Sequence, residues 1–402
     1  MTTGVNVRGP LKADIGIIGA GVMGLWLSLK LAQRGYVVAV IEKEPRLADG
    51  PSTRNEGWLH CGAYHAAAIV DQSLAMQVAH RTREGFKQTL AFAPESIEDP
   101  ESRTFALVGE EKLEEVTSRW EEAGVVYRPA GALELNAFDS QINVRDFKGI
   151  FAVQDLSIDT RVVYTKLAVA AQRLGVTFIR GTRVTALVDH VAALESPPDG
   201  PAAIAAQAFV FATGYRAMEA FESLLQVRLP MRFFRSHLMD VPRLGRHGLF
   251  GVAPGEATIM NHGNWSIVGL NKDQERVTDA SFDPIDANIE AIKVALLRLM
   301  PRADLTRGYG RACLKVDIDP CATGFANLNV TFGEPVAGYF WVLPGKMSEA
   351  PFAADVVVEA LSERVGSPRT QTVSRQKWAH DQGSDLPVAP RPIDTYDTVG
   401  PK

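Results

Sequence analysis

Three glycines near the N-terminus have the spacing of a phosphate-binding turn. Gly19, Gly21 and Gly24 lie between a short apolar run ending at Ile18 and a segment with helical periodicity. The first glycine permits a tight turn, the second lets a phosphate approach the backbone, and the third lets the helix pack on the strand. A diphosphate at the start of that helix would contact free amide groups. The spacing therefore predicts a dinucleotide site. It disfavours the alternative interpretation, in which the glycines serve only the turn and the packing of the helix.

An acidic residue follows this turn where a ribose would lie. Glu42 closes a second β-branched run, residues 36–41, and its carboxylate can accept hydrogen bonds from both ribose hydroxyls. The same charge would repel a 2′-phosphate. A second Gly-x-Gly, at Gly308 and Gly310, lacks a third glycine at the required spacing. The sequence therefore indicates a single dinucleotide-binding motif.

The elements that position these residues form a βαβ unit. Residues 14–18 read as a buried parallel strand, and Val22, Leu25 and Leu29 form one helical stripe. Residues 36–41 supply the next strand. Strand, turn, helix and strand within about 30 residues are typical of a mononucleotide-binding half.

Later segments can complete the same sheet. Asp159 or Thr160 can cap a helix, and apolar runs at 176–179, 208–211 and 340–343 read as strands. The intervening segments mix strands and helices. We therefore predict an α/β fold: a Rossmann-like domain of the glutathione-reductase type, with an inserted α+β substrate domain containing an antiparallel sheet. The expected boundaries are 11–80, 151–224 and 311–366 for the nucleotide-binding domain, 81–150 and 225–310 for the substrate domain, and 367–402 for a C-terminal tail without a core.

Composition narrows the class of protein. The 402 residues carry a net charge of -5, and Lys plus Arg (42) are outnumbered by Asp plus Glu (47), which disfavours a nucleic-acid partner. Three cysteines leave one unpaired, so a disulfide framework is not expected and a cytoplasmic location is favoured. No signal peptide, transmembrane segment or metal site is predicted.

One later stretch resembles a known family. Residues 52–64, Ser-Thr-Arg-Asn-Glu-Gly-Trp-Leu-His-Cys-Gly-Ala-Tyr, resemble FAD-dependent oxidoreductases of the D-amino-acid oxidase and glycine oxidase superfamily. The order of residues is most similar to the L-2-hydroxyglutarate dehydrogenase/oxidase branch. His65 and Ala75 depart from that branch near the expected substrate pocket. The branch's substrate is therefore not carried over.

The resemblance implies an FAD bound extended, with its ring at the boundary of the two domains. A positive charge or helix N-terminus near the ring's pyrimidine edge would stabilise the reduced flavin anion. The expected cofactor-binding residues are Gly19, Gly21, Val22, Met23, Gly24, Glu42, Lys43, Thr53, Arg54, Asn55, Gly57, Leu59, Val184, Thr213, Gly214, Gly345, Lys346 and Met347.

The resemblance also suggests catalytic residues. His60 is the candidate base, since histidine titrates near working pH and the matching family position faces the flavin. Arg311 stands where glycine-oxidase-like relatives bind a substrate carboxylate, a task that suits a bidentate guanidinium. Tyr64 can donate to a substrate oxygen, and Arg235 and His237 are weaker substrate candidates on one face of a strand. Each of these residues also has a purely structural interpretation.

These residues leave three functional hypotheses. The first is oxidation of the C–OH of a small 2-hydroxy acid by hydride transfer to flavin N5, with oxygen or a quinone or carrier as electron acceptor. The second is oxidation of an amine or amino acid to an imine on the same scaffold. The third is a flavin-binding partner protein without turnover.

Overall fold

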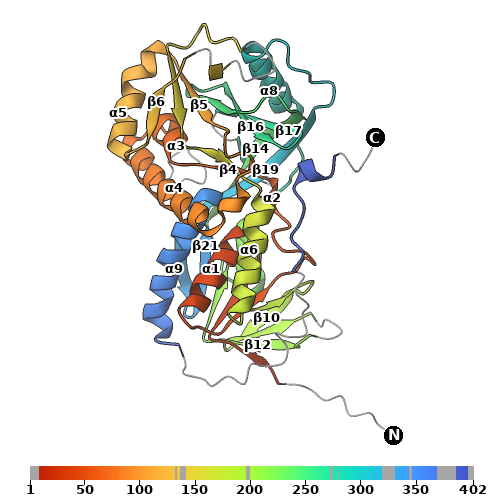
Figure 1. Ribbon diagram of the computed structural model, residues 1–402. Coiled ribbons are helices and arrows are strands. Elements are labelled where there is room, and N and C mark those ends of the chain that lie inside the picture. Colours follow the sequence, from red (N-terminus) through yellow and green to blue (C-terminus); the bar gives the residue numbers. More distant parts are fainter. Residues whose placement is uncertain are drawn as a thin grey trace.

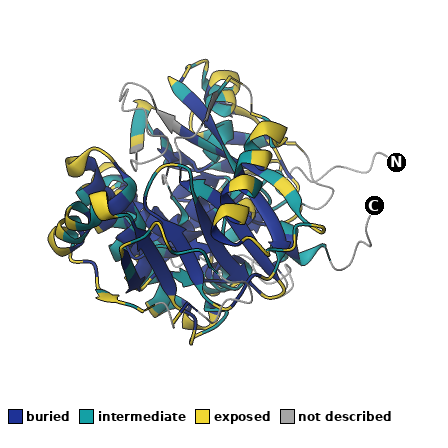
Figure 2. Ribbon diagram, turned by 90° about the horizontal axis from the view of Figure 1, so that it is seen from above, coloured by how far each residue is buried: buried dark blue, intermediate teal, exposed yellow. Residues whose placement is uncertain are grey.

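The computed structural model describes residues 9–131, 134–135, 142–195, 200–271, 275–278, 280–318, 331–343, 346–368 and 386–396. The chain forms two lobes, one containing α1, α6 and α9 and the other containing α5 and α8 (Figure 1). Figure 2 shows that the sheets form the buried interior, whereas the exposed residues lie largely on the outer helices and loops.

The first lobe is built on a six-stranded sheet with the order β20-β21-β13-β2-β3-β9. Every neighbouring pair is parallel except β20 and β21. The five strands that pair in parallel are short and largely apolar, because both faces of a parallel sheet are covered. The bounds of all six strands are β2 Ile15–Ile18, β3 Val38–Ile41, β9 Thr177–Ile179, β13 Ala208–Phe211, β20 Thr331–Val336 and β21 Tyr339–Leu343.

Helices cover one face of this sheet. Ile15, Ile17 and Val40 point into a core shared with α1 (Val22–Gln33), α6 (Thr160–Arg173) and α9 (Ala350–Val365). The opposite face, which includes Ile18 and Phe209, packs against α7 (Ala217–Leu225) and a four-stranded sheet. The strands of that sheet are β1 Leu11–Lys12, β12 Ala203–Ala205, β11 Val191–Leu194 and β10 Val184–Val188.

The second lobe contains a nine-stranded sheet, largely antiparallel. Its order is β18-β14-β17-β16-β15-β5-β7-β6, and β19 pairs with β14. The bounds are β5 Thr104–Val108, β6 Tyr127–Pro129, β7 Gly149–Val153, β14 Met231–Pro242, β15 Gly248–Gly251, β16 Glu256–His262, β17 Trp265–Asn271, β18 Glu275–Val277 and β19 Tyr309–Ile318.

Helices also enclose this sheet. Ile292 and Leu296 of α8 (Asp286–Leu299) pack on one face, and Trp120 of α5 (Leu113–Ala123) packs on the other with Phe151. Helices α3 (Ala63–Ala68) and α4 (Gln72–Phe92) contact each other and α5. Between the lobes lie α2 (Pro51–Arg54) and the two-stranded pair β4 (Trp58–Leu59) and β8 (Leu156–Ser157).

The predicted α/β architecture is confirmed. Asp159 is the N-cap of α6, and its side chain accepts a hydrogen bond of 2.9 Å from the amide of Arg161. The domain boundaries remain a prediction. The structure places β7 and β19 in the larger sheet, and α4 passes through residue 80.

Residues 386–396, part of the expected C-terminal tail, pack against the two lobes. Leu386, Ala389 and Ile393 are buried, and Leu386 and Ile393 belong to two different apolar clusters. The chain here runs along one side of the molecule from one lobe to the other (Figure 1).

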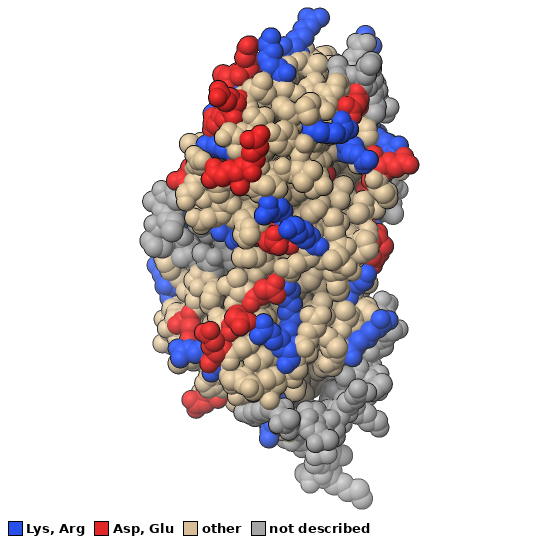
Figure 3. Space-filling model, turned by 60° about the vertical axis from the view of Figure 1, so that its left-hand side comes forward, with Lys and Arg blue, Asp and Glu red and all other residues tan. Residues whose placement is uncertain are grey.

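The surface carries mixed charge. Acidic and basic side chains are interspersed over the face seen in Figure 3. Within the described part of the chain, no helix has both the length and the apolar character needed to cross a bilayer.

Candidate active site

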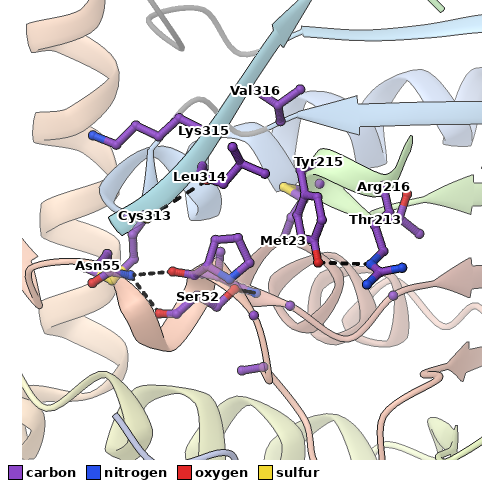
Figure 4. Close-up of a pocket in the computed structure, with 18 of the residues that line it drawn as sticks. Met23, Ser52, Asn55, Thr213, Tyr215, Arg216, Cys313, Leu314, Lys315 and Val316 are labelled. Carbon is purple, nitrogen blue, oxygen red and sulfur yellow. Dashed lines mark hydrogen bonds between the residues drawn. The ribbon is translucent and has the colours of Figure 1, made fainter. Parts of the chain in front are cut away.

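A cavity of about 420 Å³ lies where the two lobes meet. Its walls come from the turn before α1, the end of β3, β10 and the end of β13 in one lobe, and from β14 and β19 in the other. Figure 4 shows Leu314 and Val316 of β19 together with Ser52 and Asn55 of the α2 segment and Met23 of α1. One continuous cavity extends from the glycine turn to the α2 segment, His60 and Tyr64.

The glycine turn leaves no room for side chains. Gly19 has a φ of 102°, and a Cβ there would lie 2.7 Å from the carbonyl oxygen of Ala212. A Cβ on Gly24 would lie 2.0 Å from the carbonyl oxygen of Gly19. Helix α1 begins directly after Gly21, and the amide of Val22 donates to Ser52 Oγ at 3.0 Å. Gly21, Val22 and Met23 line the cavity, so the start of the helix borders it, as an anion site requires.

Glu42 lines the cavity next to this turn. Its Oε2 accepts from the amide of Ala20 at 2.7 Å, and its Oε1 accepts from the amide of Glu44 at 3.0 Å. Burial raises the pKa of Glu42, and the two backbone hydrogen bonds oppose that rise. These bonds orient the carboxyl group beside the phosphate-binding turn, which suits contact with a ribose.

His60 lies farther along the same cavity and is held by a buried carboxylate. Its Nδ1 is 2.9 Å from Asp155 Oδ2, and the Asp155 side chain is 0% exposed. Asp155 Oδ1 accepts from the amide of Cys61 at 2.8 Å. The contact with Asp155 fixes the ring by one nitrogen, so Nε2 is the nitrogen left to exchange a proton. Among the described residues, no hydrogen bond occupies Nε2.

Aromatic rings enclose His60. The Trp58 ring stacks on it at 4.6 Å between centroids, and the Tyr64 ring lies 5.6 Å away at 25°. The Tyr64 hydroxyl donates to Asn271 Oδ1 at 3.1 Å. Burial raises the pKa of Tyr64, so this phenol stays neutral. The part of the cavity around His60 is therefore a partly apolar pocket with a few placed polar groups.

Positive charge gathers at this end of the cavity. Lys315 and Lys346 line the cavity within electrostatic reach of His65, and Glu56 is a carboxylate close to both lysines; Arg235 lines the same cavity from β14. Burial and the charge of Lys315 lower the pKa of Lys346. Burial would raise the pKa of Glu56, but Lys315, Arg311 and His60 hold it below its ordinary value. The group of cations is suited to an anionic ligand.

Two buried titratable residues lie behind His60. His65 is 1% exposed, its ring lies 4.6 Å from that of His60, and neither ring nitrogen has a hydrogen-bond partner among the described residues. Burial lowers the pKa of His65 well below its ordinary value, so the ring is neutral. Glu349 is 0% exposed, and burial raises the pKa of its carboxyl group.

A protein-family model matches most of the chain. The model described as FAD dependent oxidoreductase, DAO, matches residues 14–343. The protein belongs to this family. It is therefore an FAD-dependent oxidoreductase, and the expected enzyme class and cofactor are confirmed.

Individual relatives are distant from this DAO-family chain. A probable FAD-dependent oxidoreductase of Pseudomonas aeruginosa is 39% identical over 56 residues, and the match spans 14% of this chain and 14% of that protein. Glycine oxidase from Geobacillus kaustophilus is 18% identical, with a TM-score of 0.66 over 90% of this chain and 96% of its own. L-α-glycerophosphate oxidase from Mycoplasma pneumoniae, with FAD bound, is 18% identical, with a TM-score of 0.68 over 87% and 95%. These two solved structures show the shared fold.

The residues of this DAO-family protein fit FAD. The glycine turn, the α1 start and Glu42 can hold its ADP half, and the cavity continues from there to His60 and Tyr64. Expected cofactor residues that line the cavity are Gly19, Gly21, Val22, Met23, Glu42, Lys43, Asn55, Val184, Thr213, Gly214, Lys346 and Met347. Of the expected catalytic and substrate residues, His60, Tyr64, Arg235 and His237 line it as well.

Other expected site residues support the cavity from behind. Gly24, Thr53, Arg54, Gly57 and Leu59 do not line it, and Gly345 lies outside the described residues. Thr53 Oγ1 donates to the carbonyl oxygen of Ala48 at 3.1 Å, which closes the turn before α2.

Arg311 also lies off the cavity wall. Its Nε donates to Asp240 Oδ2 at 2.7 Å, and its terminal nitrogens donate to the carbonyl oxygens of Arg54 and Asn55. The guanidinium is thus occupied by protein groups, which disfavours the expected role of binding a substrate carboxylate.

Sequence reasoning missed three residues of this site. Asp155 orients His60, Lys315 adds charge, and Ser52 accepts from the start of α1. Asp155 and Lys315 are remote in sequence from the residues they serve and carry no local motif. Ser52 lies in the stretch that resembles the family, directly before Thr53. Of the three missed residues, it is the one that this resemblance could have identified.

Proposed function

We propose that this FAD-dependent oxidoreductase oxidises the C–OH of a small 2-hydroxy acid. The observation that carries the proposal is the contact between His60 Nδ1 and buried Asp155, which leaves Nε2 as a proton acceptor. An alcohol must lose its hydroxyl proton as hydride leaves carbon, whereas an amine need only arrive unprotonated. A carboxylate that orients a histidine is the arrangement in which histidine serves as a general base.

FAD, when bound, supplies the hydride acceptor at its N5. His60 takes the hydroxyl proton at Nε2, and Asp155 stabilises the resulting imidazolium because its charge is close to Nδ1. Trp58 and Tyr64 limit the access of water to the ring. The resemblance of residues 52–64 to the L-2-hydroxyglutarate branch supports the chemical class, a 2-hydroxy acid, but not that branch's particular substrate, because His65 and Ala75 depart from it.

The acid group of the substrate would bind to cations that line the cavity. Lys315 and Arg235 line the cavity from β19 and β14, and Lys346 lines it from the chain before α9. We propose these residues, in place of Arg311, as the carboxylate site. Oxygen and a quinone or protein carrier remain alternatives for the electron acceptor.

The test is anaerobic flavin reduction with a panel of 2-hydroxy acids and amino acids. For the substrate that reduces the wild-type flavin, we expect His60→Gln to slow reduction by about 10²-fold or more, the usual contribution of a general base. Asp155→Asn should slow it by a smaller factor. The matched control is His80→Gln, because His80 is an exposed histidine on α4.

Two outcomes would contradict the proposal. An amine or amino acid that reduces the flavin equally fast in wild type and His60→Gln would establish the amine-oxidising alternative. A flavin that stays oxidised with every hydroxy acid would exclude the proposed substrate class.

A further inference from the structure

The C-terminal segment contacts the start of one loop that borders the cavity, and intervening side chains connect it to the end of that loop. We name residues 386–396 the C-terminal strap and residues 47–56 the cofactor loop. Within the cofactor loop, Ala48 to Ser52, Asn55 and Glu56 line the cavity, so its position decides the shape of the FAD site. From the contacts described below, we propose that the C-terminal strap is a positioning element that holds the cofactor loop and thereby strengthens FAD binding.

The strap holds the start of the loop by backbone pairing. The amide of Leu47 donates to the carbonyl oxygen of Pro387 at 2.9 Å, and the amide of Ala389 donates back to the carbonyl oxygen of Leu47 at 2.9 Å. Leu47 is 0% exposed, and it shares a core cluster with Leu386. The next residue, Ala48, donates to the carbonyl oxygen of Ala20 at 3.0 Å, inside the glycine turn.

A first chain of hydrogen bonds joins the strap to the end of the loop. The hydroxyl of Tyr396 donates to Asp240 Oδ2 at 2.7 Å, the same oxygen that accepts from Arg311 Nε. Arg311 then donates to the carbonyl oxygens of Arg54 and Asn55. Asp240 is 0% exposed, so its charge needs both partners. Arg311 is thus a positioning residue for the loop.

A second chain reaches the next carbonyl group. Arg391 of the strap forms an ion pair with Glu98, and Glu98 Oε2 lies 3.0 Å from His262 Nδ1. His262 Nε2 donates a hydrogen bond of 2.7 Å to the carbonyl oxygen of Glu56. The His262 ring also packs closely on Gly57, the residue directly after the loop, because a Cβ on Gly57 would lie 2.5 Å from that ring.

The two chains converge on three successive carbonyl oxygens, those of Arg54, Asn55 and Glu56. Carbonyl oxygens held from outside keep these peptide groups in one orientation, so Asn55 and Glu56 stay in place at the cavity wall. The strap also buries Ile393 in a cluster with Trp265 and Cys313 of the second lobe. It therefore links both lobes at the position of the cofactor.

The experiment compares FAD binding in strap variants. Tyr396→Phe removes one hydroxyl from buried Asp240, and deletion of residues 386–402 removes the whole strap. We expect the FAD dissociation constant, from fluorescence titration of apoprotein, to rise about threefold in Tyr396→Phe and about tenfold or more in the deletion variant, because hydrogen bonds to charged groups are lost. The release of FAD from the holoenzyme should accelerate in the same order.

The matched control is Tyr127→Phe. Tyr127 also donates its hydroxyl to a carboxylate, Glu121, but on the exposed surface of the second lobe, so FAD affinity should not change. Melting of apoprotein and holoprotein separates positioning from general stability. A positioning role predicts a larger loss in the holoprotein, since bound ligand adds stability that rises with the logarithm of its affinity.

Three results would overturn the proposal. The first is an unchanged dissociation constant in the deletion variant. The second is an equal fall in melting temperature for apoprotein and holoprotein with unchanged affinity. The third is the same change in Tyr127→Phe as in Tyr396→Phe. If the deletion variant does not fold, unchanged FAD affinity in Tyr396→Phe alone contradicts the proposal.

Discussion

At the scale of single residues, the site contains one histidine that can exchange a proton with a ligand and several buried titratable groups. His60 has a carboxylate partner and one nitrogen for proton exchange, whereas His65 beside it is neutral and enclosed. Glu349 is the least satisfied of the buried acids near the cavity. Neither of its oxygens has a hydrogen-bond partner among the described residues, and Arg81 Nε is 3.7 Å away.

We expect Glu349→Gln to stabilise the protein increasingly as pH rises above 4.5. Burial raises the pKa of Glu349 from its ordinary value of 4.5, so the folded state retains a proton that the unfolded chain releases. The stability that this proton confers is complete below pH 4.5 and is lost as pH rises through the folded-state pKa. Glutamine resembles the protonated acid and does not titrate, so the variant keeps this stability at every pH. The gain should be on the order of 1 kcal/mol.

Urea unfolding of the two proteins at pH 5 and pH 8 measures this difference. Glu110→Gln is the control, because the Glu110 side chain is 79% exposed. Equal stability differences at both pH values would show that Glu349 is ionised in the folded protein.

At the scale of elements, the glycine turn depends on contact between a helix and the strand before it. Gly24 lies in the first turn of α1, where a Cβ would meet the carbonyl oxygen of Gly19 at 2.0 Å. Backbone atoms cannot yield as a flexible side chain can. The helix start and the phosphate-binding turn are therefore fixed to each other by the absence of one methyl group.

We expect Gly24→Ala to reduce both stability and FAD affinity. The methyl group would displace α1 from β2, at a cost of about 1–3 kcal/mol for an overpacked site. FAD content after purification and thermal melting measure the two effects. Gly131→Ala should change neither, because no atom lies within 4 Å of a Cβ at that position. Full FAD content in Gly24→Ala would refute the role of this contact.

At the scale of the whole molecule, the lobes are joined by an ion network that includes the C-terminal strap. Glu98 contacts His262 and Arg391, and Arg391 also lies 3.0 Å from Asp394 and 3.7 Å from Asp159. Burial would raise the pKa of Glu98, but His262 and Arg391 lower it to about 2. The contact between the lobes is therefore sensitive to acid.

We expect wild type to lose stability as pH falls from 4.5 to about 2, and Glu98→Gln to lose less over that range. A carboxyl group with a lowered folded-state pKa stabilises the fold above its ordinary pKa of 4.5 and ceases to do so as pH falls through about 2. The wild-type advantage at neutral pH should be on the order of 3 kcal/mol. Melting curves between pH 6 and pH 2.5 measure it.

The control for this experiment is Glu134→Gln. Glu134 pairs with Arg128 on the exposed surface, where solvent weakens the ion pair, so its removal should have little effect at any pH. A parallel acid dependence in wild type and Glu98→Gln would show that another group governs the loss.

The sequence by itself determined the local architecture and the nucleotide site. Gly19, Gly21, Gly24 and Glu42 act through neighbouring backbone, so their spacing carries the information that the fold later uses. The cap at Asp159 was equally local. His60 and Tyr64 were found because they lie in the stretch that resembles the family.

Tertiary structure alone decided which distant residues meet. Asp155 reaches His60 across 95 positions, and Arg311 reaches Asn55 across 256. Such pairings depend on how two sheets pack together, and no residue spacing encodes them. For the same reason the sequence left Arg311 as a substrate-binding candidate and 386–396 as a surface tail. The composition of residues 386–396 did not indicate that Leu386 and Ile393 would pack into apolar clusters of the two lobes.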